Sequence, residues 1–113
     1  MKTIKEYIYA LQKGTITSVE IVMHCIHQIQ SKDIYYNSVA YLNPNALEEA
    51  KRLDALLQDG IVLSPLHGIP IIIKDNIDVA GMPNTANAFI LKDYMPKTDA
   101  PLIKILKEAG CII

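Results

Sequence analysis

Apolar residues recur at helical spacing in the first third of the chain. Thr3 to Glu6 and Thr17 to Glu20 each fit a capping box, in which a threonine and a glutamate three residues later satisfy free N–H groups at a helix start. Apolar side chains follow each box every three or four residues, and Gly14 between the two runs is a typical helix end. The pattern predicts two helices within residues 1–31, the second ending near Ser31, that form a helical hairpin.

From residue 38 onward, short apolar runs alternate with helical patterns. Residues 38–42 and 111–113 are strand candidates, and residues 88–91 fit a short helix or turn. Helices are expected over 44–58 and 101–109, each with a proline at its first position, where the missing N–H costs nothing. This alternation predicts the α/β class with a mostly parallel sheet.

Residues 64–81 are the least ordinary stretch. Prolines and glycines bracket three consecutive isoleucines, 71–73, and Lys74 follows them directly. A β-branched run without polar alternation predicts a strand that is covered on both faces, so Lys74 would lie where a dry strand opens into a polar turn. Burial disfavours an ammonium group and favours a basic amine. A structural lysine that pairs with Asp75 or Asp78, or extends into solvent, fits the residues too and is the commoner case.

The histidines and glycines favour ordinary structural roles. His24 and His27 are three residues apart on one predicted helix, but no further ligand stands at a recognised metal-site spacing, so they are expected on the surface. His67 precedes Gly68 in a turn and is expected to lie on the polar surface rather than to act as a catalytic group. Gly68 and Gly81 fit turns and do not form a glycine-rich nucleotide loop.

The acidic and thiol groups also lack the features of a site. Asp75 and Asp78 are too few for a closed oxygen-ligand site, so turn formation is favoured and no metal is expected. Cys25 lies on a helix face and Cys111 at an apolar strand start, without the electropositive surroundings of a reactive thiol.

Composition adds a constraint on the surface. The chain has 113 residues, half of them hydrophobic, which is enough for one small domain. A chain of this length buries only about two thirds of its unfolded surface. So much apolar content predicts an exposed apolar surface that a partner, or a missing remainder of the domain, would cover.

Charge and cysteine content exclude several classes of function. A net charge of −1 without tryptophan gives no basic field for nucleic acid. No apolar run approaches the roughly 20 residues of a membrane span, and the N-terminus has no apolar signal core. Two distant cysteines do not form a disulfide framework, so a cytoplasmic protein without membrane contact is expected.

Several motifs resemble the beginning of the amidase signature family. The run Pro65-Leu66-His67-Gly68-Ile69-Pro70, the run Lys74-Asp75-Asn76-Ile77-Asp78 and the run Ala80-Gly81-Met82-Pro83 carry the resemblance. Supporting stretches at 17–20, 39–42, 99–101 and 108–113 follow in the same order, so the resemblance covers nearly the whole chain.

The resemblance implies a fold and a reaction. The fold would be α/β: an N-terminal helical hairpin, residues 1–31, followed by the first strands and helices of the mixed-sheet amidase-signature fold, residues 38–113. Residues 1–113 would then be the truncated N-terminal part of a single domain. The family cleaves or transfers the nitrogen of carboxamides with a Ser–cis-Ser–Lys triad, needs no cofactor, and acts on small-molecule amides. Lys74 matches the triad lysine, which serves as the general base.

Two departures from the family pattern limit this expectation. The family's bridging serine, nucleophilic serine and oxyanion-hole donors lie in a Gly/Ser-rich segment further along, and no serine here matches them, so the chain alone is expected to be inactive. The serines are Ser18, Ser31, Ser38 and Ser64. Asn87 and Ala88 stand where the family usually has Gly-Ser. Asparagine tolerates a left-handed conformation, so the turn is expected to persist.

Three alternatives stay open from the sequence. The chain fits part of the A-subunit of a glutamyl-tRNA(Gln) amidotransferase as well as a free-standing amidase. It also fits a non-catalytic interaction module that docks through the exposed side of an incomplete sheet. The apolar faces of the first two helices are candidates for a homodimer contact or for packing against a missing remainder.

Overall fold

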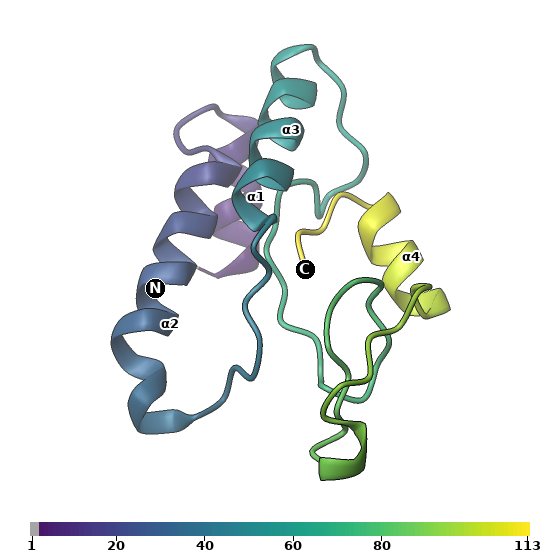
Figure 1. Ribbon diagram of the computed structural model, residues 1–113. Helices are drawn as coiled ribbons and strands as arrows, with labels where there is room; N and C mark the ends of the chain where they lie inside the picture. Colours follow the sequence, from purple (N-terminus) through teal and green to yellow (C-terminus); the bar gives the residue numbers. More distant parts are fainter. Residues whose placement is uncertain (1–2) are drawn as a thin grey trace.

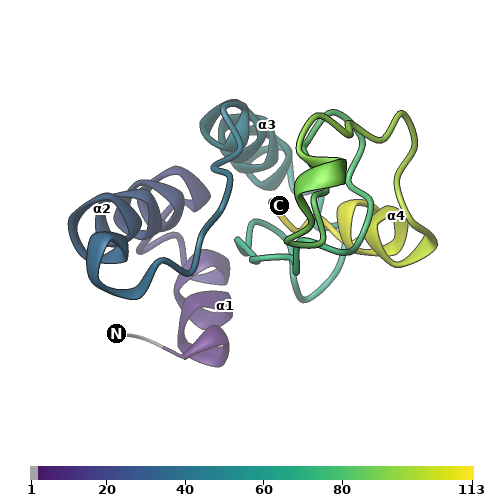
Figure 2. The ribbon, with the colours of Figure 1, turned by 60° about the horizontal axis from the view of Figure 1, so that its bottom comes forward.

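The computed structural model describes residues 3–113 (Figure 1). Its helices are α1 (Ile4–Gln12), α2 (Ser18–Tyr36), α3 (Ala46–Gln58), the short 3-10 helix η1 (Phe89–Leu91) and α4 (Pro101–Glu108). Helices α1, α2 and α3 lie on one side of the molecule, and α4 with the long loops around η1 lies on the other (Figures 1 and 2). No helix in this described range is long and apolar enough to cross a membrane.

The predicted starts of α1, α2 and α4 are confirmed, and that of α3 at Pro44 is wrong. Both capping boxes form, and at α2 the Thr17 N–H donates to Glu20 Oε2 at 2.8 Å while the Glu20 N–H donates to Thr17 Oγ1 at 3.1 Å. Pro101 occupies the first turn of α4, and α3 begins at Ala46, two positions after the predicted proline start. Side-chain capping therefore defines the starts of α1 and α2 in the way the sequence indicates.

The predicted end of the second helix near Ser31 is wrong. Helix α2 continues to Tyr36 and ends at Asn37, which adopts a left-handed conformation with φ 48°. The Asp33 carboxylate then accepts hydrogen bonds from the Ser38 backbone and side chain, and these bonds lower the pKa of Asp33. Asparagine tolerates this conformation better than other non-glycine residues, and it ends the helix here as glycine often does.

Helix α3 caps helix α2 from a distance. The Asp54 carboxylate accepts the backbone N–H of Ser18 at 2.7 Å and that of Val19 at 3.0 Å, both in the first turn of α2. These N–H groups have no partner within the helix, and the helix dipole favours a negative charge at this end. The ion–dipole contact therefore fixes how α2 and α3 pack.

The core consists of two clusters on either side of α2. Val22 faces a cluster with Ala50 and Leu53 of α3, which Ile112 completes from the C-terminal end of the chain. The neighbouring residue Ile21 faces a second cluster with Leu11 of α1 and Ile69. Adjacent residues on a helix point in directions about 100° apart, so α2 serves both clusters at once.

The predicted strands do not form within residues 3–113. The described chain has one isolated parallel bridge, between Pro70 and Ile112, with hydrogen bonds from Ile71 N–H to Ile112 O at 2.8 Å and from Ile112 N–H to Ile69 O at 3.0 Å. The strand expected at 38–42 is irregular. A β-ladder forms only where two extended segments lie side by side over several residues. Within residues 3–113 the predicted strands have too little extended chain beside them to form one. The parallel direction of the single bridge agrees with the predicted sheet.

The predicted surface position of His67 is also wrong. Its side chain is only 5% exposed and joins the turn to α3. The Leu63 N–H donates to Nδ1 at 3.2 Å, so Nε2 carries the proton and donates to the Leu53 carbonyl at 2.9 Å. Both ring nitrogens therefore bond to the backbone, one to the segment before the turn and the other to α3.

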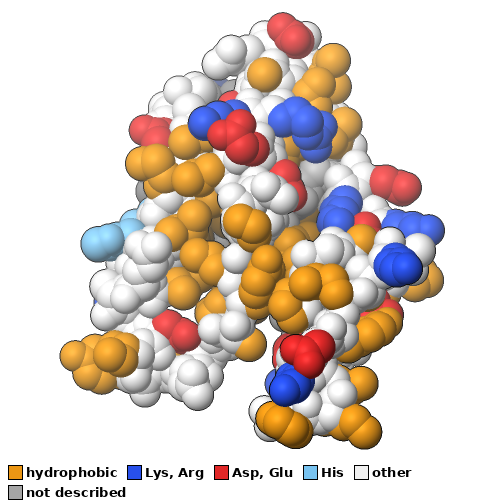
Figure 3. Space-filling view, in the orientation of Figure 1, with side chains coloured by type: hydrophobic (Ala, Val, Ile, Leu, Met, Phe, Trp, Pro, Cys, Tyr) orange, Lys and Arg blue, Asp and Glu red, His pale blue; other side chains and the backbone are white. Residues whose placement is uncertain are grey.

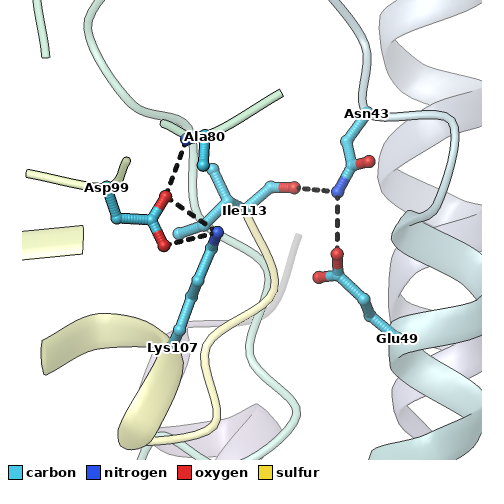
Figure 4. A network of polar contacts seen from close by, with 6 residues as sticks. All are labelled: Asn43, Glu49, Ala80, Asp99, Lys107 and Ile113. Carbon is cyan, nitrogen blue, oxygen red and sulfur yellow. Dashed lines mark hydrogen bonds and ion pairs between the residues drawn. The ribbon is translucent and has the colours of Figure 1, made fainter. Parts of the chain in front are cut away.

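Polar contacts anchor the end of the chain and the last helix (Figure 4). The Asn43 amide donates to the Ile113 carbonyl at 2.8 Å. Asp99 accepts from Lys107 Nζ at 2.9 Å and from the Ala80 N–H at 2.7 Å. Burial raises the pKa of Asp99, but the hydrogen bonds from Lys107 and Ala80 outweigh it, and the pKa lies below its usual value. These contacts hold the segment near residue 80 against α4.

Gly68 marks the tightest contact between the turn and α2. It has φ 78°, and a Cβ added there would overlap Ser18 Oγ and lie 3.1 Å from Ser18 Cβ. Gly60 has the same φ, but a Cβ there would meet no atom within 4 Å. Substitutions at the two glycines can therefore distinguish the cost of backbone strain, which both share, from the cost of steric overlap, which only Gly68 has.

We expect Gly68→Ala to destabilise the fold much more than Gly60→Ala. Left-handed strain costs alanine about 1 kcal/mol at either position, and overpacking against Ser18 adds about 2 kcal/mol at Gly68. Urea unfolding followed by circular dichroism measures both variants. Equal losses in the two would show that Gly68 does not contact α2 as described.

Candidate functional site

Lys74 occupies the first position of a tight turn. Its carbonyl accepts the N–H of Asn76 at 2.8 Å and that of Ile77 at 3.1 Å. The side chain is exposed, and none of the ion pairs within residues 3–113 includes it. The expected dry strand before it is not dry in this chain, because Ile71 is 36% and Ile72 is 68% exposed. The backbone thus presents the lysine on a defined turn, and its side chain reaches solvent.

Asp75 ties this turn to the loop at residues 84–88. Its carboxylate accepts the Thr85 N–H at 2.9 Å and the Thr85 hydroxyl, and its carbonyl accepts the Ala86 N–H at 2.8 Å. The hydroxyl bond is the main reason that the pKa of Asp75 lies below its usual value, and the Thr85 N–H and the nearby Lys74 charge contribute. The three bonds fix the residue next to Lys74 from both its side chain and its backbone.

The loop opposite Asp75 has an unusual backbone. Ala86 and Asn87 are both left-handed, with φ 45° and 56°, and the Asn87 N–H donates to Thr85 Oγ1 at 3.1 Å. The expectation that Asn87 would preserve the turn is confirmed. Ala86 has no side-chain group that compensates for this conformation, so the loop is strained there.

Asp78 serves a neighbouring part of the same loop. It accepts hydrogen bonds from the side chains of Asn84 and Tyr94, and the Asn84 N–H donates to the Tyr94 carbonyl at 3.2 Å. Asp75 and Asp78 therefore stabilise turns, as the sequence favoured. No group of three His, Cys, Asp or Glu residues within 3–113 could hold a metal ion.

Sequence reasoning missed Asn84 and Thr85 as partners of these aspartates. Asn84 is buried although it lies in a polar loop, and Thr85 is half-buried. The sequence does show two aspartates in one turn and two hydrogen-bonding side chains in the next loop. It does not show which side chain bonds to which aspartate, since such side chains bond equally well within their own turns.

The other candidate residues keep structural roles. His24 and His27 are exposed on α2, as expected. Cys25 is half-buried and Cys111 is buried, both are free, and burial raises the pKa of each thiol. A raised pKa means less thiolate, which agrees with the expected lack of reactivity.

The pKa of Asp75 predicts a pH dependence of stability. A carboxyl whose pKa is lowered by folding stabilises the fold above its unfolded pKa, near 4, and this contribution is lost as the pH falls through the folded value. Thr85→Val removes the largest cause of the shift. We expect the free energy of unfolding to fall less between about pH 5 and pH 2.5 in Thr85→Val than in the unmodified chain.

Chemical denaturation at a series of pH values gives the dependence of the free energy of unfolding on pH. Thr98→Val is the matched control, because Thr98 is exposed in the same polar region and has no contact with Asp75. If the free energy of unfolding falls as steeply with pH in Thr85→Val as in Thr98→Val, the Thr85 hydroxyl is not the main cause of the lowered pKa of Asp75.

Ala86 offers a stabilising substitution. Glycine adopts a φ of 45° without steric cost, so Ala86→Gly should raise the free energy of unfolding by roughly 0.5–1 kcal/mol after its greater chain entropy is subtracted. Ala88 has φ −111°, so Ala88→Gly should lower stability instead. Thermal unfolding of both variants checks the opposite signs, and a loss at Ala86 would show that its backbone is not left-handed.

Comparison with known proteins places this geometry in a family. The family model described as Amidase matches residues 20–113. A putative amidase of Schizosaccharomyces pombe is 36% identical over 98% of this chain and 19% of its own length. The A-subunit of the chloroplastic/mitochondrial glutamyl-tRNA(Gln) amidotransferase of Arabidopsis thaliana is 36% identical over 92% of this chain and 19% of its own length.

A solved structure agrees with the fold. The peptide amidase of Stenotrophomonas maltophilia superposes with a TM-score of 0.93 and 32% identity, over 98% of this chain and 23% of its own. The chain thus spans about a fifth of the length of these relatives. The match over residues 20–113 shows that the chain belongs to the amidase family, the amidase-signature enzymes.

Proposed function

We propose that this chain supplies the base of an amide-cleaving centre, and that Lys74 is that base. The observation that carries the proposal is the position of Lys74: it follows the Ile71–Ile73 run inside the family motif, on a turn that Asp75 and Thr85 hold. A catalytic group needs such a fixed backbone, since small misplacements reduce its effect strongly.

The proposed reaction is hydrolysis of a carboxamide C–N bond through a Ser–cis-Ser–Lys triad. The neutral amine of Lys74 takes a proton through the bridging serine while the nucleophilic serine attacks the carbonyl carbon. The leaving nitrogen then receives a proton, and water releases the acyl group from the serine. The substrate class is a small-molecule amide, and no cofactor takes part.

The serines of this chain support the proposal that it does not complete the reaction alone. The Ser64 hydroxyl donates to the Ala109 carbonyl at 2.6 Å, and the Ser31 hydroxyl donates to the His27 carbonyl at 2.7 Å. Ser38 bonds to Asp33, and Ser18 is fully buried. Each hydroxyl is therefore engaged in local structure or enclosed, so none is available as a nucleophile next to Lys74.

Domain organisation and location follow as further parts of the proposal. Residues 1–113 would be the N-terminal part of one amidase-signature domain, with the helical hairpin followed by the beginning of a mixed-sheet α/β core. The parallel Pro70–Ile112 bridge supports the sheet. Two unpaired cysteines fit a reducing compartment such as the cytoplasm.

The second candidate function is that of the A-subunit of an amidotransferase. The relative from Arabidopsis, and one from Clostridium novyi that is 39% identical, carry that name. The two candidates share the triad chemistry and differ in the acceptor of the released ammonia. Release of free ammonia from a simple amide indicates an amidase, whereas glutamine-dependent amidation of charged tRNA indicates the amidotransferase.

A chimera tests the role of Lys74. Residues 3–113 replace the matched segment of the Stenotrophomonas peptide amidase, and ammonia release from a peptide amide is measured. We expect an active chimera, and a loss of kcat by about 1,000-fold or more in its Lys74→Ala variant. Lys97→Ala, at an exposed lysine outside the turn, is the control and should keep its activity.

The unmodified 113-residue chain provides the complementary measurement. We expect no amide hydrolysis above background. An active chimera that tolerates Lys74→Ala, or turnover by the 113-residue chain alone, would contradict the proposal.

A further inference from the structure

The Thr85 hydroxyl links the turn that carries Lys74 to the loop at residues 84–88. It donates to the Asp75 carboxylate and accepts the Asn87 N–H at 3.1 Å, while the Thr85 N–H donates to the same carboxylate at 2.9 Å. The hydroxyl therefore acts as a donor toward the turn and as an acceptor within its own loop. Thr85 and Asp75 are both half-buried, so these contacts are partly shielded from water.

The loop around Thr85 adopts a strained backbone where it meets Asp75. Ala86 and Asn87 have φ 45° and 56°, and such a backbone persists only where surrounding contacts hold it. This conformation turns three consecutive N–H groups, those of residues 85 to 87, toward Asp75 or toward the hydroxyl that bonds to it. The strain is therefore located where the loop bonds to the neighbour of Lys74.

Other contacts hold this loop in place without the Thr85 hydroxyl. The Gly81 N–H donates to the Pro96 carbonyl at 3.0 Å, and the Ala100 N–H donates to the Asp78 carbonyl at 2.9 Å. These bonds anchor the chain before and after the loop. Loss of the hydroxyl would therefore loosen the turn at residues 74–77 without detaching the loop from the rest of the chain.

The amine of Lys74 depends on the backbone of this turn for its direction. Within residues 3–113, no ion pair restrains the side chain. The net charge is only −1, and Figure 3 shows acidic and basic side chains of the described residues interspersed on one face, without a large patch of either sign. A lysine stem is flexible. The direction in which this stem leaves the turn is therefore the main restraint on the amine.

We infer that Thr85 is a positioning residue for the amine of Lys74. Its hydroxyl fixes Asp75, and Asp75 fixes the turn from which the lysine side chain extends. The inference rests on the proposed function of Lys74 as a base. It adds that the rate of proton transfer depends on a hydroxyl in the neighbouring loop, because small misplacements of a catalytic group reduce its effect strongly.

Kinetics of the chimera with the Stenotrophomonas peptide amidase test this role. Thr85→Val keeps the shape of the side chain and removes the hydroxyl, so we expect kcat to fall by about 10- to 100-fold while KM changes by less than about twofold. Thr85→Ser keeps the hydroxyl and should hold kcat within about threefold of the unmodified chimera. Thr98→Val, at an exposed threonine outside residues 84–88, is the matched control and should leave both constants unchanged.

Hydrogen exchange in the 113-residue chain separates loosening of the turn from unfolding. The Ile77 N–H bonds to the Lys74 carbonyl at 3.1 Å, so its amide should exchange about tenfold faster in Thr85→Val than in the unmodified chain. The Gly81 and Ala100 amides report opening of the anchored parts of the chain and should accelerate less. NMR measures all three amides in one experiment.

The results distinguish this role from the proposed function. An inactive Lys74→Ala chimera, together with equal kcat in Thr85→Val and Thr98→Val, would overturn the positioning role and leave Lys74 as the base. Equal losses of kcat in Thr85→Ser and Thr85→Val, or equal acceleration of the Ile77 and Ala100 amides, would overturn it too. A chimera that tolerates Lys74→Ala contradicts the proposed function and the effect on catalysis, while the exchange of Ile77 still decides whether Thr85 holds the turn.

Discussion

The buried imidazole of His67 connects the helical half of the molecule to the loop half, and the remaining structure depends on it. Its two nitrogens bond to the Leu63 N–H and the Leu53 carbonyl, so the ring occupies the gap between the turn and α3. Gly68 next to it donates to the Gly110 carbonyl at 2.8 Å and packs on Ser18. A buried polar group is tolerated only when its bonds are made, and here the same bonds orient the segment that leads to Lys74.

This arrangement explains how a lysine is placed with so little regular structure around it. From the turn at His67, the chain continues through a single parallel bridge at Pro70 and reaches Lys74 four residues later. Asp75 then fixes the other side of the lysine through Thr85. Backbone hydrogen bonds hold the position on both sides of Lys74, so the side chain itself needs no partner to be positioned.

The accuracy of the sequence-based predictions follows the range of the interactions. Capping boxes and glycines at helix ends act within four residues, and those predictions hold, as does the proline start of α4; the proline start predicted at Pro44 is wrong, because α3 begins at Ala46. The predicted end of α2 is wrong because Asn37 takes the place that glycine usually has. The surface assignment of His67 is wrong because its partners, four and fourteen residues away, are backbone atoms that no side-chain pattern reveals. Isoleucine runs suit a sheet and so predict strands, but pairing partners decide whether a strand forms.

The role proposed for Lys74 sets two requirements, a fixed position and a dry environment, and the described residues meet the first of them. Its position comes from the turn at 74–77 and the Asp75–Thr85 contact, all of which lie within this chain. A dry environment would have to come from whatever covers Ile71 and Ile72, because these side chains are exposed here. An isoleucine run next to a lysine shields it from water only when a second surface closes over both. The base proposed at Lys74 thus has its backbone scaffold within residues 3–113, while the dry environment that such a base needs would require a second surface over the isoleucine run.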